Sequence, residues 1–323
     1  MKPFKKPVVY TFHRAWSKLS PFPCRPRTAS FLPMQRLLAT MILGGLAVVS
    51  FAQQVQPTHR DIAYDDQHAS QKLDVYLTES RKPTAAIVYI HGGGWRAGSK
   101  DRVPRWLTDA VAAGWASVIS VEYRFTDVAT HPAQTDDCLR AIQFVRFNAA
   151  KWNIDPERIG VTGGSAGGHL SLYVALHDDA KKTDASDPVQ QQSSRVACAV
   201  SFAGPTDWSL LSQIEHNHPA YRQLLGYEPG TPAEKMDANS KRDVSPINHL
   251  SPDDPAIMMV HGDADDIVPL KHSDKLNQEA RKIGITSQLV IVPGANHGVA
   301  GAGAGSATDQ ATQFVRKWLK ASP

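Results

Sequence analysis

The stretch Gly163-Gly164-Ser165-Ala166-Gly167-Gly168 decides how the rest of this 323-residue chain is interpreted. It is a G-x-S-x-G motif between a short apolar run, residues 158–162, and a segment rich in helix formers, residues 166–176. A serine in a sharp turn between a strand and a helix exposes its hydroxyl, and the tight turn excludes side chains on the flanking glycines. The motif therefore predicts Ser165 as a nucleophile, although G-x-S-x-G also occurs in plain glycine-rich turns.

Apolar runs and amphipathic segments alternate on both sides of this motif. Several runs are continuously apolar, which is typical of strands covered on both faces. The alternation predicts an α/β fold with a mostly parallel central sheet and helices on both faces. In such a fold, functional groups collect at the carboxyl ends of the strands. The predicted strands are 59–64, 71–77, 85–90, 117–121, 158–162, 195–203, 256–260 and 287–292, and the predicted helices are 104–113, 134–149, 166–176, 270–283 and 309–320.

An aspartate and a histidine follow the last two predicted strands. Asp265 comes after residues 256–260, with Asp263 and Asp266 close by, and His297 comes after residues 287–292. A serine hydroxyl is a poor nucleophile at neutral pH, so an imidazole must accept its proton and a carboxylate must hold that imidazole in the right tautomer. Ser165, Asp265 and His297 are therefore the candidate catalytic residues.

A run of three glycines, Gly92 to Gly94, follows the predicted strand 85–90. Attack on an ester carbonyl creates an oxyanion, which is stabilised by backbone N–H groups that approach closely because no side chain intervenes. We expect Gly92 and Gly93, together with Ala166 after the nucleophile, to supply these groups.

The motifs together resemble one family. His-Gly-Gly-Gly-Trp, Gly-Gly-Ser-Ala-Gly-Gly-His, Gly-Pro-Thr-Asp, His-Gly-Asp-Ala-Asp-Asp-Ile-Val-Pro and Gly-Ala-Asn-His-Gly are similar to those of feruloyl and acetyl-xylan esterase-like α/β-hydrolases (the BD-FAE type), and more distantly to hormone-sensitive-lipase-like esterases. The resemblance covers about residues 73–319. It implies an α/β-hydrolase fold, the order Ser-Asp-His in the chain, and Asp265 rather than Asp266 as the acid.

The same resemblance implies what the protein acts on. It implies carboxylester hydrolysis without a metal or an organic cofactor, with a small ester or an acylated carbohydrate as substrate, such as acetylated or feruloylated plant polysaccharide. Gly164 stands where the lipase-like group has an aspartate, which favours the first family.

Two other functions share part of this pattern. A prolyl-oligopeptidase-like peptidase shares the order of the triad, but Ala166 after the nucleophile and the short N-terminal part argue against it. A non-catalytic binding protein of the same fold would be expected to lack one of Ser165, Asp265 and His297, and all three are present.

Further residues near the motifs are candidates for pocket-lining or structural roles. Trp95 and Trp208 are candidates for lining a substrate pocket or for plain packing, and Glu122 and Arg124 are expected to form a structural ion pair. Residues 209–252 are irregular and polar, and they form a candidate cap-like insertion. Three histidines are expected to be structural: His91 and His261 to orient loops, and His169 to pack.

The first 52 residues differ from the rest. They hold eight Lys or Arg and no Asp or Glu, and without them the formal charge changes from +4 to −4, so the basic balance does not indicate nucleic-acid binding. Residues 34–52 have the basic start, apolar run and small residues of a secretory signal with cleavage after Ala52. A retained anchor is the alternative, but the run 37–49 is shorter than the roughly 20 residues that span a bilayer.

We therefore expect a secreted or periplasmic protein with no stable membrane anchor and a single domain over residues 53–323. Residues 1–33 are interpreted as an extension upstream of the true start, Met34. Oligomeric state and a disulfide between Cys138 and Cys198 stay open.

Overall fold

The computed structural model describes residues 55–212, 218–299 and 305–321. Residues 1–33 and the expected signal peptide, 34–52, lie outside this part of the chain. Residues 52–323 form one compact unit.

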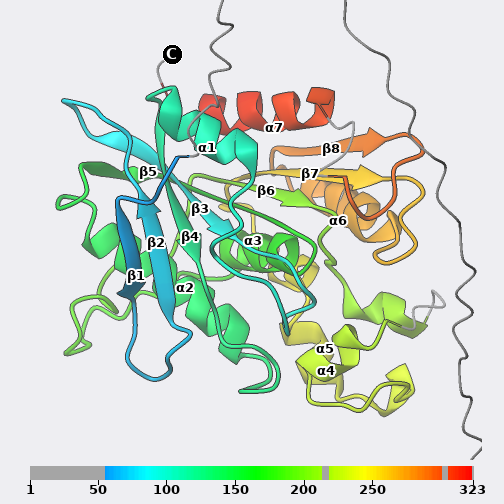
Figure 1. The fold of residues 1–323 in the computed structure, drawn as a ribbon. Helices are drawn as coiled ribbons and strands as arrows, with labels where there is room; N and C mark the ends of the chain where they lie inside the picture. The colour runs from blue at the N-terminus through cyan, green and yellow to red at the C-terminus, as the bar shows by residue number, and fades with distance from the viewer. Residues whose placement is uncertain (1–54, 213–217, 300–304, 322–323) are drawn as a thin grey trace, which may run out of the picture. The chain divides into compact units, whose positions relative to one another are not determined.

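The strands of the described residues form one eight-stranded sheet in the order β1-β2-β4-β3-β5-β6-β7-β8. The pairs β1–β2 and β2–β4 are antiparallel, and every later pair is parallel (Figure 1). This confirms the predicted mostly parallel sheet, opened by an antiparallel pair. The strands are β1 (His59–Ala63), β2 (Lys72–Tyr76), β3 (Thr84–Ile90), β4 (Ala116–Val121), β5 (Ile154–Gly164), β6 (Cys198–Phe202), β7 (Ala256–Gly262) and β8 (Ser287–Val292).

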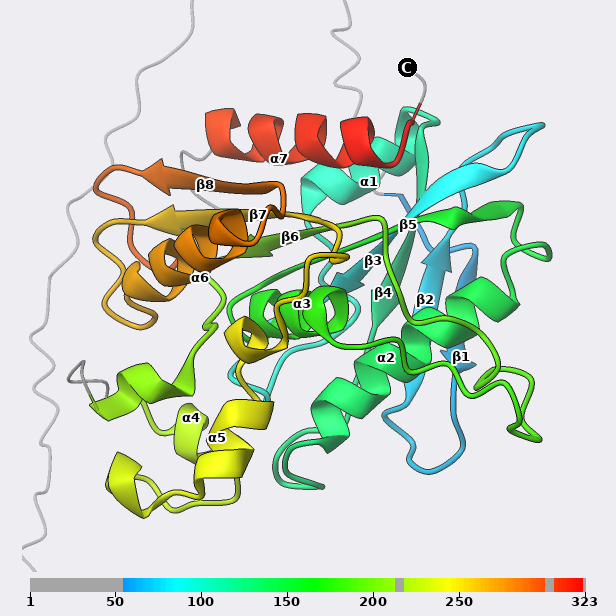
Figure 2. The same ribbon diagram turned by 180° about the vertical axis from the view of Figure 1, so that it is seen from behind.

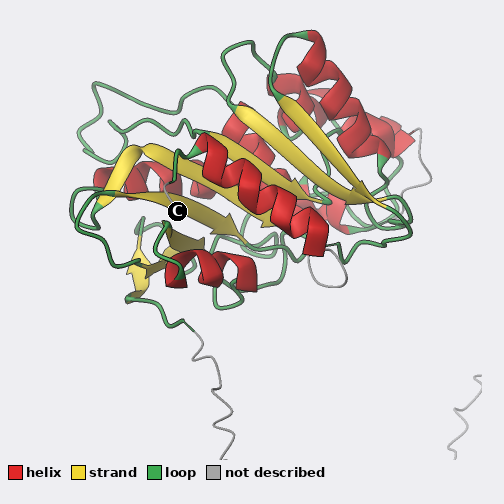
Figure 3. Ribbon diagram, turned by 90° about the horizontal axis from the view of Figure 1, so that it is seen from above, coloured by secondary structure: helices red, strands yellow, loops and turns green. Residues whose placement is uncertain are grey.

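Helices cover both faces of this sheet. One face packs against α1 and α7, whose Leu107 and Phe314 belong to one apolar cluster. The other face packs against α2, α3 and α6, whose Ile142, Leu170 and Leu276 belong to a second cluster. Figure 3 shows α1 and α7 lying across one face of the strands. The long helices are α1 (Arg105–Ala112), α2 (Ala133–Phe147), α3 (Ala166–Leu176), α6 (Lys271–Lys282) and α7 (Gly305–Trp318).

The central strands are buried along almost their whole length because both sheet faces are covered. In β3 every residue but Tyr89 is buried, and every residue of β4, β6 and β7 is buried. A buried central strand gains hydrophobic stabilisation from both of its faces, which is why these runs carry no polar alternation. Helix α3 is also buried throughout.

Element boundaries differ from the predicted ones by a few residues. β5 begins at Ile154 rather than 158, because the first part pairs with β3 beyond a bulge despite its charged residues. β6 begins at Cys198 rather than 195. α7 begins at Gly305, one turn earlier than predicted.

The expected insertion, residues 209–252, is made of short helices. They are η1 (Trp208–Ser212), α4 (Ala220–Leu224), η2 (Ala233–Lys235), α5 (Ala238–Asp243) and η3 (Pro246–His249). Figure 2 shows α4 and α5 beside each other, on the side of the sheet that carries α3 and α6. Helix α3 contacts η3, so the insertion rests on the helix that follows Ser165.

Cys138 and Cys198 are both free, buried thiols. They belong to the apolar clusters on opposite faces of the sheet, which explains why they do not form a disulfide. Within the described ranges, no helix combines the length and the apolar character needed to cross a bilayer.

Candidate active site

Ser165 lies in the turn between β5 and α3, at the carboxyl end of a central strand (Figure 1). Its backbone has φ +56° and ψ −122°, a conformation that is unfavourable for a residue with a side chain. The turn is compressed against β3: a Cβ on Gly163 would lie 2.4 Å from the carbonyl oxygen of Ile90, and one on Gly167 would lie 2.0 Å from it. The glycines therefore allow the close approach that aims the hydroxyl outward.

The structure brings Ser165, His297 and Asp265 together. Nε2 of His297 is 2.8 Å from Oγ of Ser165, and Nδ1 of His297 is 2.8 Å from Oδ2 of Asp265. An ionised carboxylate only accepts hydrogen bonds, so Nδ1 carries the ring proton and Nε2 is free to accept the serine proton. This is the tautomer that a general base needs.

Asp265 is buried among hydrogen-bond donors. Oδ1 accepts bonds from the backbone N–H groups of Ile267 and Val268, both at 2.9 Å, and Oδ2 lies 3.3 Å from Nε2 of His261. Burial alone would raise the pKa of Asp265, but hydrogen bonds from His261 and His297 outweigh it and hold that pKa well below its ordinary value. The carboxylate is therefore ionised, whereas the alternative acid, Asp266, is exposed.

The loops that carry the acid and the base are bonded to each other. Oδ1 of Asp263 accepts a 2.6 Å bond from the N–H group of Gly294, and the N–H group of Ala264 donates to the carbonyl oxygen of Ala295 at 3.0 Å. These bonds fix the loop after β8 against the loop after β7, and so they set the position of His297.

The glycine loop, Gly92 to Gly94, lies directly against the nucleophile. A Cβ on Gly92 would be 2.6 Å from the carbonyl oxygen of Gly164 and 3.4 Å from Cβ of Ser165. Gly93 has φ +122°, and a Cβ there would lie 2.0 Å from the carbonyl oxygen of Ala97. Ala166 begins α3, so its N–H group has no carbonyl partner one turn earlier in the helix. Gly92 and Ala166 thus adjoin Ser165, and Gly93 is the next residue of the same loop.

Buried His91 and half-buried Glu122 support this loop. Nε2 of His91 is 2.7 Å from Oε1 of Glu122, and Nδ1 is 2.8 Å from the carbonyl oxygen of Gly92. Oε2 of Glu122 accepts a 3.1 Å bond from the N–H group of Lys100, and the hydroxyl of Tyr123 donates to the carbonyl oxygen of His91 at 3.1 Å. His91 therefore orients the loop, as the sequence predicts.

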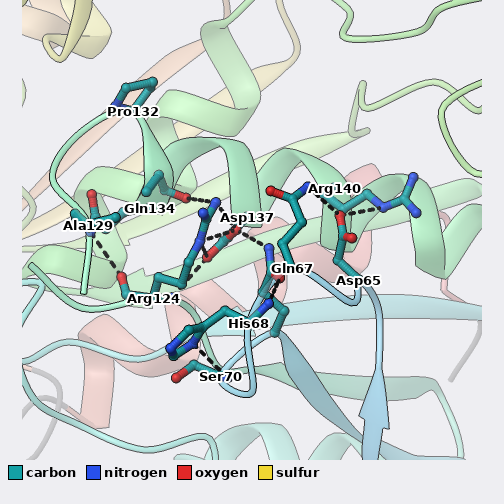
Figure 4. A network of polar contacts seen from close by, with 12 residues as sticks. Asp65, Gln67, His68, Ser70, Arg124, Ala129, Pro132, Gln134, Asp137 and Arg140 are labelled. Carbon is teal, nitrogen blue, oxygen red and sulfur yellow. Dashed lines mark hydrogen bonds and ion pairs between the residues drawn. The ribbon is translucent and has the colours of Figure 1, made fainter.

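The expected Glu122–Arg124 pair is wrong. Arg124 instead places its guanidinium on Asp137, with its Nη2 donating to Oδ1 at 2.7 Å (Figure 4). Glu122 thus reaches His91 beside the glycine loop, whereas Arg124 reaches Asp137 on α2. Glu122 is a supporting residue of the site that the sequence reasoning missed.

The two tryptophans have different places. Trp95 lines the cavity that contains Ser165, and its indole N–H donates to Nδ1 of His169 at 3.1 Å. His169 is buried, as expected, and its Nε2 donates to the carbonyl oxygen of Val244 at 2.7 Å. Trp208 is fully buried, and its indole N–H donates to the carbonyl oxygen of Tyr221 at 3.2 Å. It is absent from the described lining of the cavity, so Trp208 fits the packing alternative and Trp95 the pocket-lining one.

A cavity of about 430 Å³ opens at Ser165 and His297. The insertion supplies part of its wall, which agrees with a substrate-facing segment. Its other walls are mainly apolar. Ile267, two residues after Asp265, is 37% exposed there. Most of the residues that line the cavity could not be predicted from the sequence, because they come from loops far apart in the chain. The lining residues are Gly93, Gly94, Trp95, Arg96, Ala97, Ser165, Pro205, His218, Ala220, Tyr221, Ile267, Val268 and His297.

Another cavity, of about 740 Å³, lies between α5, η3 and α6 and includes none of the three candidate catalytic residues. Lys275 and Asp207 form an ion pair at its wall. Among the residues that the structure describes, no group of three or more His, Cys, Asp or Glu side chains is arranged to hold a metal ion.

The fold and the geometry at Ser165 define the chain as an α/β-hydrolase of the esterase type. A sequence model of the BD-FAE family matches residues 73–280, and the chain belongs to this family.

Among curated relatives, "Probable carboxylic ester hydrolase LipM" from Mycobacterium tuberculosis is 30% identical over 243 residues, covering 71% of this chain and 54% of that protein. The chain spans between half and two thirds of the length of the first such relatives.

Similar solved structures are also esterases. The truncated form of a carbohydrate esterase from gut microbiota is 30% identical with a TM-score of 0.70, covering 83% of this chain and 99% of that one. An acetyl ester-xyloside bifunctional hydrolase from Caldicellulosiruptor lactoaceticus is 29% identical with a TM-score of 0.65, covering 77% and 87%.

Proposed function

We propose that this protein is a serine carboxylesterase that hydrolyses short-chain acyl esters, with acetyl or feruloyl esters of plant polysaccharide as its substrates. The observation that carries the proposal is the pair of 2.8 Å contacts that join Asp265, His297 and Ser165 in the productive tautomer. The glycine loop beside Ser165 adds the N–H groups that an oxyanion needs.

The reaction follows from this arrangement. Oγ of Ser165 attacks the ester carbonyl carbon while Nε2 of His297 takes the hydroxyl proton, and the N–H groups of Gly92, Gly93 and Ala166 bind the resulting oxyanion. Collapse of this intermediate breaks the bond to the alcohol, which leaves with the proton from Nε2. Water then attacks the acyl-enzyme in the same way, and the carboxylic acid is released with Ser165 regenerated.

Two observations support the proposed substrate class: the apolar walls of the cavity and the substrates named for similar proteins. The walls beside Ser165 are mainly apolar, which suits an acyl group or an aromatic ring. A carbohydrate esterase and an acetyl ester-xyloside hydrolase are among the similar structures. An esterase from Thermogutta terrifontis, 25% identical over 81% of this chain and 95% of that one with a TM-score of 0.65, was solved with propionate bound.

We place this activity outside the cytoplasm. The support is the sequence of residues 34–52, with its basic start, its apolar run and the small residues before Gln53. Expression of the full chain in a bacterium with a periplasm, followed by N-terminal sequencing of the recovered protein, tests this. A mature N-terminus at Gln53 supports secretion, and an uncleaved chain in the cytoplasm refutes it.

The activity is tested with purified protein on 4-nitrophenyl acetate, 4-nitrophenyl butyrate, acetylated xylan, methyl ferulate and a 4-nitroanilide. We expect turnover of the esters, with Ser165→Ala reducing it to background. Ser306→Ala, an exposed serine on α7, is the matched control and should behave as wild type. Cleavage of the anilide without turnover of any ester would overturn the assignment.

A further inference from the structure

A single arginine stands at the cavity that contains Ser165. Arg96 lines this cavity together with Ser165 and His297, and its side chain is exposed. A Cβ on Gly94 would lie 3.9 Å from Nε of Arg96, so the side chain lies against the glycine loop rather than extending away from it. Its backbone N–H donates to the carbonyl oxygen of Gly93 at 3.3 Å, which fixes the turn.

Arg96 is held without being neutralised. Its Nη1 donates to Oε1 of Gln223 on α4 at 2.8 Å, and an amide oxygen carries no charge. Across the described residues, no ion pair involves Arg96, whereas Arg124 and Arg140 each contact an aspartate. The bond to Gln223 uses one of the five N–H donors of the guanidinium. The remaining N–H donors of the guanidinium can form a bidentate hydrogen-bonded contact with a carboxylate.

The positive charge acts inside the cavity. Among the described residues that line it, those that can carry charge are Arg96, His218 and His297, and none is an Asp or a Glu. Burial lowers the pKa of His218, and the charges of Arg96 and His297 lower it further. A bound anion would therefore meet the charge of Arg96 directly, whereas the carboxylate of Asp265 is buried and bonded to His297.

We propose that Arg96 binds a carboxylate of the substrate, so that the preferred esters are acylated sugars that carry a carboxylate, namely uronic acids or chains substituted with them. This inference rests on the proposed esterase activity and names the substrate class of the same site. Gln223 is a positioning residue, because it acts through Arg96.

The test compares two small esters that differ in one group: the acetylated methyl glycoside of glucuronic acid and that of glucose. Acetate release gives kcat/KM for each, and the readout is the ratio of the two values. Because Arg96 is exposed and solvent weakens exposed ion pairs, we expect wild type to prefer the acid by about three- to tenfold. The preference should fall as salt is added, because screening weakens an exposed contact.

Four variants make the test specific. Arg96→Gln should bring the ratio close to one, and Arg96→Lys should keep part of the preference because it keeps the charge. Gln223→Ala should lower the ratio less than Arg96→Gln. Arg105→Gln, an exposed arginine on α1, is the matched control and should keep the wild-type ratio. A wild-type ratio near one, or a ratio that Arg96→Gln leaves unchanged, would overturn the proposal.

A binding measurement separates this inference from the activity on which it rests. Ser165→Ala should bind the acetylated glucuronoside more tightly than the glucoside in titration calorimetry, and adding Arg96→Gln should abolish the difference. If wild type hydrolyses no ester at all, the proposed function fails. If esters are hydrolysed but Ser165→Ala binds both glycosides equally, the role of Arg96 fails alone.

Discussion

Replacing Gly92 by alanine tests the geometry of the glycine loop most directly. The added Cβ would lie 2.6 Å from the carbonyl oxygen of Gly164, and real Cβ contacts essentially never fall below 3.0 Å. The loop must therefore shift by at least 0.4 Å, the difference between these two distances, and the shift displaces the expected oxyanion donors relative to Ser165. The atom it meets is backbone, which cannot rotate away.

The expected loss follows from this displacement. Misplacing a reacting group by about 1 Å costs on the order of 100-fold, and losing one oxyanion donor costs about 100- to 1,000-fold. We expect kcat for 4-nitrophenyl acetate to fall about 100-fold, which corresponds to about 2.7 kcal/mol. Since the clash also strains the folded state, the free energy of unfolding should fall by about 1–3 kcal/mol.

The assay combines steady-state kinetics with the rate at which a fluorophosphonate labels Ser165, because phosphonylation uses the same donors. Gly305→Ala is the control, since a Cβ there has nothing within 4 Å. Kinetics of Gly92→Ala within about threefold of wild type, in a protein that remains folded, would be incompatible with the loop as an oxyanion site.

Three further predictions concern groups around the site. Glu122→Gln should lower kcat about tenfold, and Glu122→Ala should lower it more, because each weakens the hydrogen bond to His91 that supports the glycine loop. The size of the loss follows from a hydrogen bond worth about 1–3 kcal/mol, and an unchanged kcat in Glu122→Ala would refute this supporting role. Asp265→Asn should lower kcat about 10⁴-fold while Asp266→Asn stays near wild type, and the reverse result would transfer the acid role to Asp266. Burial lowers the pKa of His169 to about 3, so below the ordinary pKa of 6.5 the unfolded chain binds a proton that the folded chain does not, and stability falls from pH 6.5 towards pH 3. Each such group adds up to about 1.4 kcal/mol per pH unit, so His169→Gln should flatten the pH dependence of urea unfolding, and an unchanged slope would contradict this assignment.

The sequence predicted what depends on local pattern. Continuous apolar runs indicated the central strands, and the glycines around Ser165 indicated the turn, because a strand covered on both faces and a compressed turn each restrict residue type where they occur. The loops that carry Asp265 and His297 could be placed near Ser165, because parallel strands end at one edge of the sheet. Element ends were less predictable, as in β5, where Ile154 pairs with Thr84 of β3 ahead of a bulge that contains the charged residues.

Contacts between distant side chains could not be predicted in the same way. Glu122 and Arg124 have opposite charges two residues apart, yet each meets a partner on another element, His91 and Asp137. Trp208 follows a strand as Trp95 does, but nothing in its local sequence shows that Tyr221 covers it. Such pairings depend on how the whole chain packs rather than on residue type or spacing.

The arrangement separates the parts that perform chemistry from the parts that select substrate. Ser165, Asp265 and His297 stand on turns at strand ends, where the sheet fixes their positions. The insertion instead forms part of the cavity wall and is joined by hydrogen bonds to α3 and to the loop after β3. The carbonyl oxygen of Val244 accepts a bond from His169 on α3, His169 accepts one from Trp95, and Gln223 accepts one from Arg96. Substitutions in the insertion can therefore change which alcohol or acid is bound while leaving the 2.8 Å contacts of the candidate triad in place. Exchanging the insertion for that of a relative should accordingly alter substrate preference, measured as ratios of kcat/KM, far more than the rate at which a fluorophosphonate labels Ser165.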